Sequence, residues 1–273
     1  MTQITRRTAA LLALLGPAIA KAAGRGDARS STSATVQPKE GLEMTLRSTG
    51  NEKIAIVIYD HMTALDVIGP HYFLARLAGA KVEFVAKSLE PVACENGLVL
   101  LPTASFETCS KDLDILLIGG GTAGTLAAMR DAATIAFLAD RGSCAKWVAS
   151  VCTGSLLLGQ AGLLRGYRAT SHWIGRPLLK DFGAIEVNRR VVFDRNRATG
   201  AGVSAGLDLA LALIQKLRPL EFAQTMQLLA EYAPEPSLRA GTPETAPPPV
   251  LAEARKLTAG FVSSAREVAR SAR

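Results

Sequence analysis

Histidines and paired cysteine motifs are scarce in this sequence. Its 273 residues include only three histidines, and no C-x-x-C spacing links the four cysteines, Cys94, Cys109, Cys144 and Cys152. Because zinc sites are built mainly from clustered cysteine and histidine ligands, the small number of histidines and the cysteine spacing give no reason to expect a metal site. Neither a G-x-G-x-x-G motif nor a Walker lysine accompanies the glycine run 119–121, so a phosphate-binding loop is not predicted there.

Aromatic residues are also few, at 5% of the chain, and charged residues make up 20%. The formal net charge is +7, but the basic residues are scattered and are not interleaved with aromatic ones, which argues against a nucleic-acid partner. Hydrophobic residues are plentiful at 48%, which suffices for the core of one large α/β domain or of two small ones.

The first 23 residues have the order of segments that is typical of an export signal. Arg6 and Arg7 precede an apolar stretch, 9–20, that is too short to span a bilayer and is followed by small residues. We therefore predict a periplasmic protein without a stable membrane anchor after cleavage, exported by the twin-arginine or the general secretory route. A frayed amphipathic helix or a retained anchor is the alternative. In an oxidising compartment Cys94 and Cys109 could pair.

Residues 24–50 are predicted to be a flexible linker, because serine and threonine are frequent in them, and an α/β domain is predicted for 51–233. The continuous apolar runs 54–59 and 114–118 are typical of parallel strands buried on both faces. Because strands alternate with helices, we predict a doubly wound, mostly parallel sheet flanked by helices. Further strands are expected at 82–86, 98–101 and 147–151. One helix is expected to end at Leu77, and two others are expected at 125–139 and 156–164.

The last third of the chain has a different pattern. A weak alternation over 186–199 predicts a β-hairpin that turns at 194–196, and two helices are predicted for 201–217 and 219–232. Residues 234–273 are expected to form a proline-rich surface arm that ends in a basic surface helix.

One junction between a predicted strand and a predicted helix carries a candidate nucleophile. Cys152 lies in the sequence S-V-C-T-G, between the small residues Ser150 and Gly154. Small flanking residues permit the close backbone approach of a nucleophile elbow, in which a sharp turn projects the nucleophile outward. A position at a helix N-terminus also favours the thiolate, so we expect a lowered pKa. A buried structural cysteine is the alternative, and the elbow spacing favours the nucleophile.

The segment 151–173, VCTGSLLLGQAGLLRGYRATSHW, resembles the elbow region of the ThiJ/PfpI superfamily, in its isonitrile hydratase branch. The resemblance extends over 53–255 and implies a flavodoxin-like or class I glutamine amidotransferase-like fold. It further implies a homodimeric enzyme that uses a cysteine nucleophile and no cofactor on a small-molecule substrate. The Cys-His dipeptide of the protease-like members is absent, because Thr153 follows Cys152, and this argues against peptidase activity.

The same resemblance assigns roles to residues around the cysteine. Asp66 matches the acidic partner of the superfamily, and beside a thiolate its carboxyl is expected to stay protonated and to act as a general acid. Gly120 and Gly121 are expected to present backbone N–H groups to developing negative charge, Thr153 to position water or substrate, and His172 to support the site. The alternatives are an aspartate that only stabilises the first turn of a helix and a purely structural histidine.

We therefore predict that the Cys152 thiolate attacks an isocyanide, that Asp66 supplies a proton, and that water releases an N-substituted formamide. A ligand sensor without enzymatic activity is one alternative, because a similar domain forms the N-terminal half of AraC-type regulators. Only about 40 residues follow Tyr232, which is too few for the DNA-binding module of such regulators. A redox or aldehyde-stress protein that acts through Cys152 is the other alternative.

Overall fold

The structure, a computed structural model, describes residues 49–271. These residues belong to one compact unit of the chain. The predicted export signal and nearly all of the predicted linker lie outside the described residues.

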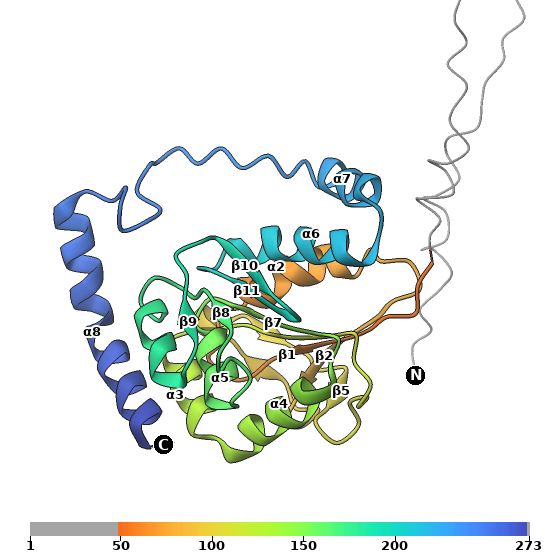
Figure 1. The fold of residues 1–273 in the computed structure, drawn as a ribbon, viewed down its shortest axis with the longest axis horizontal. Coiled ribbons are helices and arrows are strands. Elements are labelled where there is room, and N and C mark those ends of the chain that lie inside the picture. Colours follow the sequence, from red (N-terminus) through yellow and green to blue (C-terminus); the bar gives the residue numbers. More distant parts are fainter. Residues whose placement is uncertain (1–48, 272–273) are drawn as a thin grey trace, which may run out of the picture. The chain divides into compact units, whose positions relative to one another are not determined.

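A seven-stranded sheet forms the centre of this unit, in the order β10-β11-β7-β6-β1-β2-β5 (Figure 1). Neighbouring strands are parallel except β10 and β11, which form an antiparallel hairpin at one edge. The predicted α/β fold with a mostly parallel sheet is therefore confirmed. The strands are β1 (Lys53–Val57), β2 (Lys81–Ala86), β5 (Ala104–Ser105), β6 (Ile115–Ile118), β7 (Trp147–Val151), β10 (Val191–Asp194) and β11 (Arg197–Gly200).

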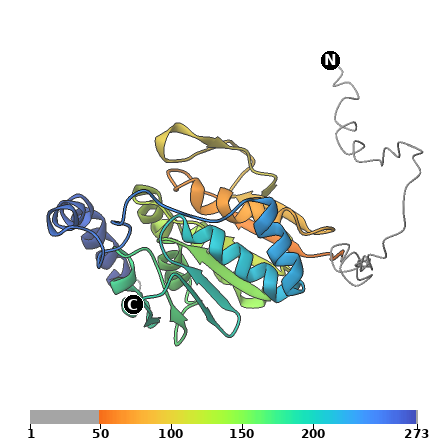
Figure 2. The ribbon, with the colours of Figure 1, turned by 90° about the horizontal axis from the view of Figure 1, so that it is seen from above.

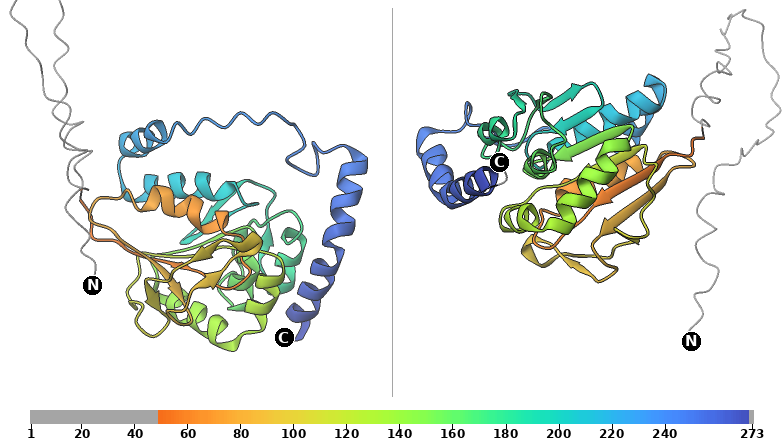
Figure 3. Two further views of the ribbon diagram at one scale, coloured as in Figure 1. Left: turned by 180° about the vertical axis from the view of Figure 1, so that it is seen from behind. Right: turned by 60° about the horizontal axis from the view of Figure 1, so that its bottom comes forward.

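The central strands are apolar throughout because both faces of the sheet are covered. Ile54 and Ile56 of β1 enter one hydrophobic core, while Ala55 and Val57 enter the other, as the alternation of side chains along a strand requires. Helices α2, α6 and α7 lie side by side over the first core, and α3, α4 and α5 cover the second (Figures 2 and 3). Their bounds are α2 (Leu65–Leu74), α3 (Ala123–Arg130), α4 (Ala132–Cys144), α5 (Gly154–Gln160), α6 (Ala205–Leu217) and α7 (Leu220–Leu229).

Two predicted elements are wrong in detail. The strand expected at 98–101 is the short β4 (Val99–Leu100), which pairs with β3 (Val92–Ala93) in a separate hairpin rather than joining the main sheet. The helix expected at 125–139 is divided into α3 and α4 at Asp131. The Asp131 side chain accepts the Thr134 N–H at 3.1 Å and so caps a new helix, which explains the break.

The C-terminal part follows its predicted order. Residues 234–247, which we call the arm, form no helix or strand and are largely exposed, and the long helix α8 (Pro248–Ser271) follows them. Phe261 and Ala265 of α8 are buried in the second core, so this helix is attached to the domain by apolar contacts. The remaining short elements are η1 (Glu95–Gly97), β8 (Arg168–Ala169), η2 (Arg176–Phe182) and β9 (Ile185–Glu186). No helix within 49–271 has the length and apolarity needed to cross a membrane.

The sheet brings together three segments that are far apart in the sequence. In register, Val57 at the end of β1 pairs with Ile118 at the end of β6, and Ile118 pairs with Ser150 of β7. The carboxyl ends of these three parallel strands therefore meet at one edge, where doubly wound folds place their sites. After this edge, the chain beyond β1 leads to Asp66, the chain beyond β6 enters the glycine run 119–121, and the chain beyond β7 enters Cys152.

Candidate active site

Cys152 occupies a sharp turn between β7 and α5. Its φ angle is 60°, in the left-handed region that a cysteine rarely adopts. Gly154 permits the turn, because a Cβ at this position would lie 2.6 Å from the carbonyl oxygens of Ile118 and Gly119. This strained turn, together with the close backbone approach behind it, is the geometry of the predicted nucleophile elbow.

The backbone of Cys152 is held by hydrogen bonds from both directions. Its carbonyl oxygen accepts hydrogen bonds from Ser171 Oγ at 2.9 Å and from Ser155 Oγ at 3.2 Å. Its N–H donates to the carbonyl oxygens of Ala201 at 2.7 Å and Gly200 at 3.2 Å. These bonds offset the cost of the unusual φ angle and fix the direction of the side chain.

Asp66 is the acidic neighbour of the cysteine. It lies in the first turn of α2, is fully buried, and accepts the Gly120 N–H at Oδ2 with a distance of 2.7 Å. Its other oxygen, Oδ1, is buried and has no hydrogen-bond partner among the described residues, and the nearby Cys152 thiol acts to lower the pKa of the carboxyl. Burial raises the pKa of Asp66 from 3.8 to about 7, and the nearby charge of Glu95 contributes in the same direction.

The lowered pKa expected for Cys152 is wrong. Burial, and then the negative charge of Asp66, raise the pKa of the Cys152 thiol well above its usual value. Hydrogen bonds from the backbone N–H groups of Thr153 and Val203 counteract this only in part. The resting site therefore holds a protonated sulfur beside a carboxyl group that titrates near neutrality, so the two groups can exchange a proton.

Gly120 and Gly121 lie beside the elbow, as predicted, but their N–H groups already have acceptors. The Gly120 N–H bonds to Asp66, and the Gly121 N–H bonds to Thr153 Oγ1 at 3.0 Å. Glycine is required at 120, because a Cβ there would lie 2.5 Å from the Thr153 nitrogen. Stabilisation of developing negative charge by these two amides stays a prediction, and it requires one of the two bonds to open.

The Thr153 hydroxyl group is engaged by protein atoms. It donates to the Gly121 carbonyl oxygen at 2.7 Å, accepts the Gly121 N–H, and lies 3.0 Å from Thr125 Oγ1. Thr125 in turn lies 3.1 Å from the hydroxyl of Tyr59, which donates to the Gly119 carbonyl oxygen at 2.9 Å. In this structure Thr153 therefore fixes the glycine run to the elbow, and its predicted contact with water or substrate stays a prediction.

His172 lies next to the site without a hydrogen bond to Cys152. Its ring packs against the backbone after β11, since a Cβ at Gly202 would lie 2.8 Å from His172 Cδ2. Burial lowers the pKa of His172, which favours the neutral imidazole. Its sequence neighbour Ser171 bonds to the Cys152 carbonyl oxygen, and the supporting role of His172 stays a prediction.

Several residues of the site were not predicted from the sequence, namely Tyr59, Thr125, Ser171 and Val203. Ser171 lies within the T-S-H-W segment, so its proximity to His172 was an available signal. Val203 acts through its backbone N–H, which has no sequence signature. Tyr59 follows β1 and Thr125 lies in α3, and only the folded structure shows that their hydroxyl groups are in contact.

The other cysteines are free thiols: Cys94 and Cys109 are buried, and Cys144 is exposed. The pairing considered for Cys94 and Cys109 is therefore not present in this structure. Within the part of the chain that the structure describes, no group of three or more His, Cys, Asp or Glu side chains is arranged to hold a metal ion.

Comparison with known proteins agrees with this geometry. The model of the DJ-1/PfpI family matches residues 52–216. The chain is 44% identical over 216 residues to a Pseudomonas putida protein named isonitrile hydratase, covering 79% of this chain and 94% of that protein. It is 30% identical over 149 residues to DJ-1alpha of Drosophila melanogaster, covering 53% of this chain and 69% of that protein.

Structural comparison gives the same result. The crystal structure of a ThiJ/PfpI family protein from Pseudomonas syringae matches with a TM-score of 0.82 and 49% identity, covering 88% of this chain and 99% of that chain. The predicted resemblance to the ThiJ/PfpI superfamily is therefore confirmed. The chain belongs to the DJ-1/PfpI family.

Proposed function

We propose that this protein is a cysteine-dependent isonitrile hydratase, which adds water to an isocyanide and releases an N-substituted formamide. The buried Asp66–Cys152 pair is the observation that carries the proposal, because hydration of an isocyanide needs a nucleophile and a group that moves protons at the same carbon. The 44% identity to the Pseudomonas putida isonitrile hydratase supports this choice of substrate class.

The first step adds the thiol across the isocyanide carbon. Ionised Asp66 takes the proton from Cys152 Sγ, and the sulfur forms a bond to the terminal carbon of the isocyanide. Asp66 then returns the proton to that carbon, which gives a thioimidate with a carbon–nitrogen double bond. A carboxyl with a pKa of about 7 suits this exchange, because it can both accept and donate a proton near neutral pH.

The second step adds water to the thioimidate. Asp66 accepts a proton from the water molecule as its oxygen bonds to the same carbon, and Asp66 passes that proton to the nitrogen. The carbon–sulfur bond then breaks as the new hydroxyl group becomes the carbonyl, the proton of that hydroxyl moves through Asp66 to the sulfur, and the formamide leaves. The thiol and the carboxylate are restored, so the sequence balances with one isocyanide and one water.

The proposal is tested by incubating the purified protein with benzyl isocyanide and following loss of the isocyanide and formation of N-benzylformamide by NMR. Cys152→Ser is expected to abolish turnover. Cys144→Ser, which changes an exposed cysteine outside the site, is the matched control and is expected to retain it. Absence of formamide with the wild-type protein, or turnover by Cys152→Ser, would refute the proposal. Conversion of methylglyoxal instead would favour the aldehyde-stress alternative.

A further inference from the structure

Glu95, which has no part in the proposed reaction steps, joins two segments of the site. It is half-buried and begins η1, shortly after β3. Its Oε2 accepts the Thr63 hydroxyl at 2.8 Å, and its Oε1 accepts the Thr122 N–H at 3.1 Å and the Thr122 hydroxyl at 3.0 Å. One carboxylate therefore connects the segment that leads to Asp66 with the residue that follows the glycine run 119–121.

Residues 60–66, which we call the acid loop, are bonded to the glycine run next to this connection. The Glu95 N–H donates to a carbonyl oxygen of the loop at 2.9 Å, and the Thr63 N–H donates to the Gly120 carbonyl oxygen at 2.8 Å. The Asp66 N–H donates to the Thr63 carbonyl oxygen at 3.1 Å, and the Gly120 N–H donates to Asp66 Oδ2 at 2.7 Å. Because Thr63 is bonded to Glu95, Gly120 and Asp66 at once, loss of the Glu95 side chain would shift the Asp66 carboxyl group.

The acid loop has an unusual backbone that depends on such outside contacts. The φ angle of His61 is 58°, in the left-handed region, and a conformation of this kind persists only where neighbouring structure holds it. The hairpin of β3 and β4 supplies that support. The His61 N–H donates to the Ala93 carbonyl oxygen at 2.7 Å, and the Ala93 N–H donates to Asp60 Oδ1 at 3.0 Å. Glu95 continues this contact from the hairpin toward the site.

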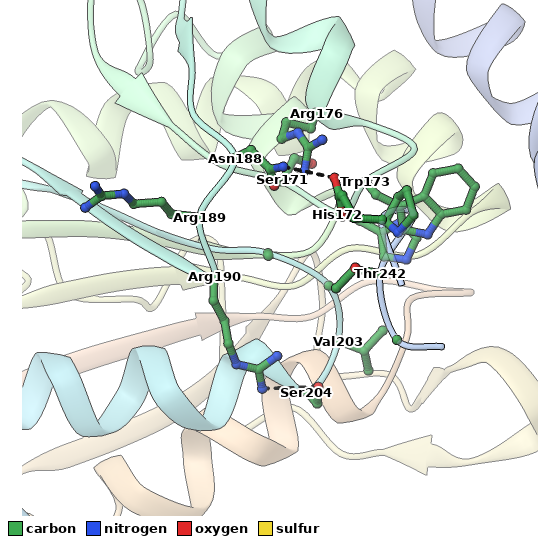
Figure 4. Close-up of a pocket in the computed structure, with 15 residues that line it drawn as sticks. Ser171, His172, Trp173, Arg176, Asn188, Arg189, Arg190, Val203, Ser204 and Thr242 are labelled. Atoms are coloured by element: carbon green, nitrogen blue, oxygen red, sulfur yellow. Dashed lines mark hydrogen bonds between the residues drawn. The ribbon is translucent and has the colours of Figure 1, made fainter. Parts of the chain in front are cut away.

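The nucleophile is held by other segments. Ser171, which lines the cavity shown in Figure 4, donates from Oγ to the Cys152 carbonyl oxygen at 2.9 Å. The Cys152 N–H donates to the Ala201 carbonyl oxygen at 2.7 Å. Neither bond involves the acid loop or Glu95. A change at Glu95 is therefore expected to displace Asp66 relative to Cys152 while the elbow stays in place.

The charge of Glu95 acts on the same carboxyl group. The three hydrogen bonds to its side chain come from neutral donors, which do not cancel its charge. Burial is the largest cause of the raised pKa of Asp66, and the charge of Glu95 raises this pKa further. The Gly120 N–H and the Cys152 thiol act in the opposite direction.

The other titratable groups near Asp66 leave Glu95 as the charge that can be changed separately. Burial raises the pKa of the Tyr59 hydroxyl, which therefore stays neutral. Burial also raises the pKa of the Cys152 thiol. On α6, which packs against α2, Asp208 is paired with an arginine at 2.6 Å.

We propose that Glu95 is a positioning residue of the reaction, whose carboxylate clamps the acid loop to the glycine run and so holds Asp66 beside Cys152. Its charge also keeps Asp66 able to donate a proton near neutral pH. This inference rests on the proposed function and adds to it a residue that acts through Asp66.

Two variants separate the clamp from the charge. Glu95→Ala removes both, and kcat for benzyl isocyanide is expected to fall by about 10-fold or more with little change in KM, because the proton-transfer group is displaced. Glu95→Gln keeps the shape of the side chain, and its amide can still bond to both threonines, so kcat above neutral pH is expected to stay close to the wild-type value. Its lost charge lowers the pKa of Asp66, so the rise of kcat/KM is expected at lower pH. Glu90→Gln, at an exposed glutamate, is the matched control and is expected to change neither quantity.

Urea unfolding gives a readout that does not need turnover. The stability that protonated Asp66 contributes, measured against Asp66→Asn, is lost as the pH rises through the folded-state pKa of Asp66. In the Glu95→Gln background this loss is expected at lower pH than with Glu95 present. Thermal melting checks that each variant folds, and Glu95→Gln keeps the test open if Glu95→Ala does not.

The outcomes distinguish this inference from the proposed function. Wild-type kcat in Glu95→Ala, or pH profiles of Glu95→Gln that do not move, would overturn the inference and leave the proposed function intact. A loss of stability that moves to lower pH in Glu95→Gln, without turnover of any isocyanide by the wild-type protein, would support the action of Glu95 on Asp66 and refute the function.

Discussion

Replacement of Asp66 by asparagine isolates the proton-transfer role of this residue. The side chain keeps its shape, and the amide oxygen can still accept the Gly120 N–H that Asp66 Oδ2 accepts at 2.7 Å. The amide cannot take the proton of the Cys152 thiol, so kcat for isocyanide hydration is expected to fall by about 10²-fold or more. Labelling of Cys152 by iodoacetamide is expected to persist, because the thiol and the elbow remain.

The pKa of Asp66 sets a second, independent expectation. Burial raises it from 3.8 to about 7 in the folded protein, and this difference corresponds to ~4 kcal/mol that favours the folded state while Asp66 is protonated. This contribution is complete below about pH 4, is lost as the pH rises from about 4 to about 7, and is absent above that. The free energy of unfolding of the wild-type protein, relative to Asp66→Asn, should therefore fall by ~4 kcal/mol across this window.

The catalytic efficiency is expected to change over the same pH range, but in the opposite direction to the stability. Ionised Asp66 is the form that accepts the thiol proton, so kcat/KM of the wild-type protein is expected to rise with pH up to about 7. Asp66→Asn should lack this rise. The assays are urea unfolding and steady-state kinetics from about pH 4 to about pH 8, with the exposed Asp140→Asn as control. A kcat within 10-fold of the wild-type value, or a stability difference that does not change with pH, would refute the reasoning.

Three further predictions concern the glycine run, the N-terminus and the assembly. Gly120→Ala places a Cβ 2.5 Å from the Thr153 nitrogen, so turnover should be abolished. Circular dichroism should show that the variant still folds, and an unchanged kcat would contradict the close packing of Gly120 against the elbow. Export to the periplasm is proposed from the twin arginine, and N-terminal sequencing of periplasmic protein should begin between Ala20 and Gly24, whereas an intact Met1 would count against it. A homodimer is proposed from the superfamily, and sedimentation at micromolar concentration should show it; a monomer alone would exclude it.

The central sheet and the elbow could be predicted because they depend on local patterns. The strand predicted at 147–151 is β7, with the same bounds, since a short apolar run ahead of small residues indicates both the strand and its end. The strand predicted at 98–101 was wrong because hydrophobicity alone does not show that its residues are exposed. Leu98 and Leu101 are 46% and 67% exposed in a small hairpin.

The electrostatics of the site could not be predicted from the sequence. The lowered pKa expected for Cys152 followed from its place at a helix N-terminus, which is a local feature. Its raised pKa depends on burial and on Asp66, which is 86 positions earlier in the chain and is brought close by the pairing of β1, β6 and β7. The backbone N–H of Val203 reaches the thiol from a third segment, again through the fold.

The central claim is that Cys152 bonds covalently to the carbon of the isocyanide. Its most direct test is acid quenching of the reaction with benzyl isocyanide at short times, followed by mass analysis of the peptide that contains Cys152. The proposed mechanism predicts a transient mass increase equal to one isocyanide on that peptide, and none on the same peptide of Cys152→Ser. An unmodified Cys152 peptide throughout turnover by the wild-type protein would contradict the covalent mechanism.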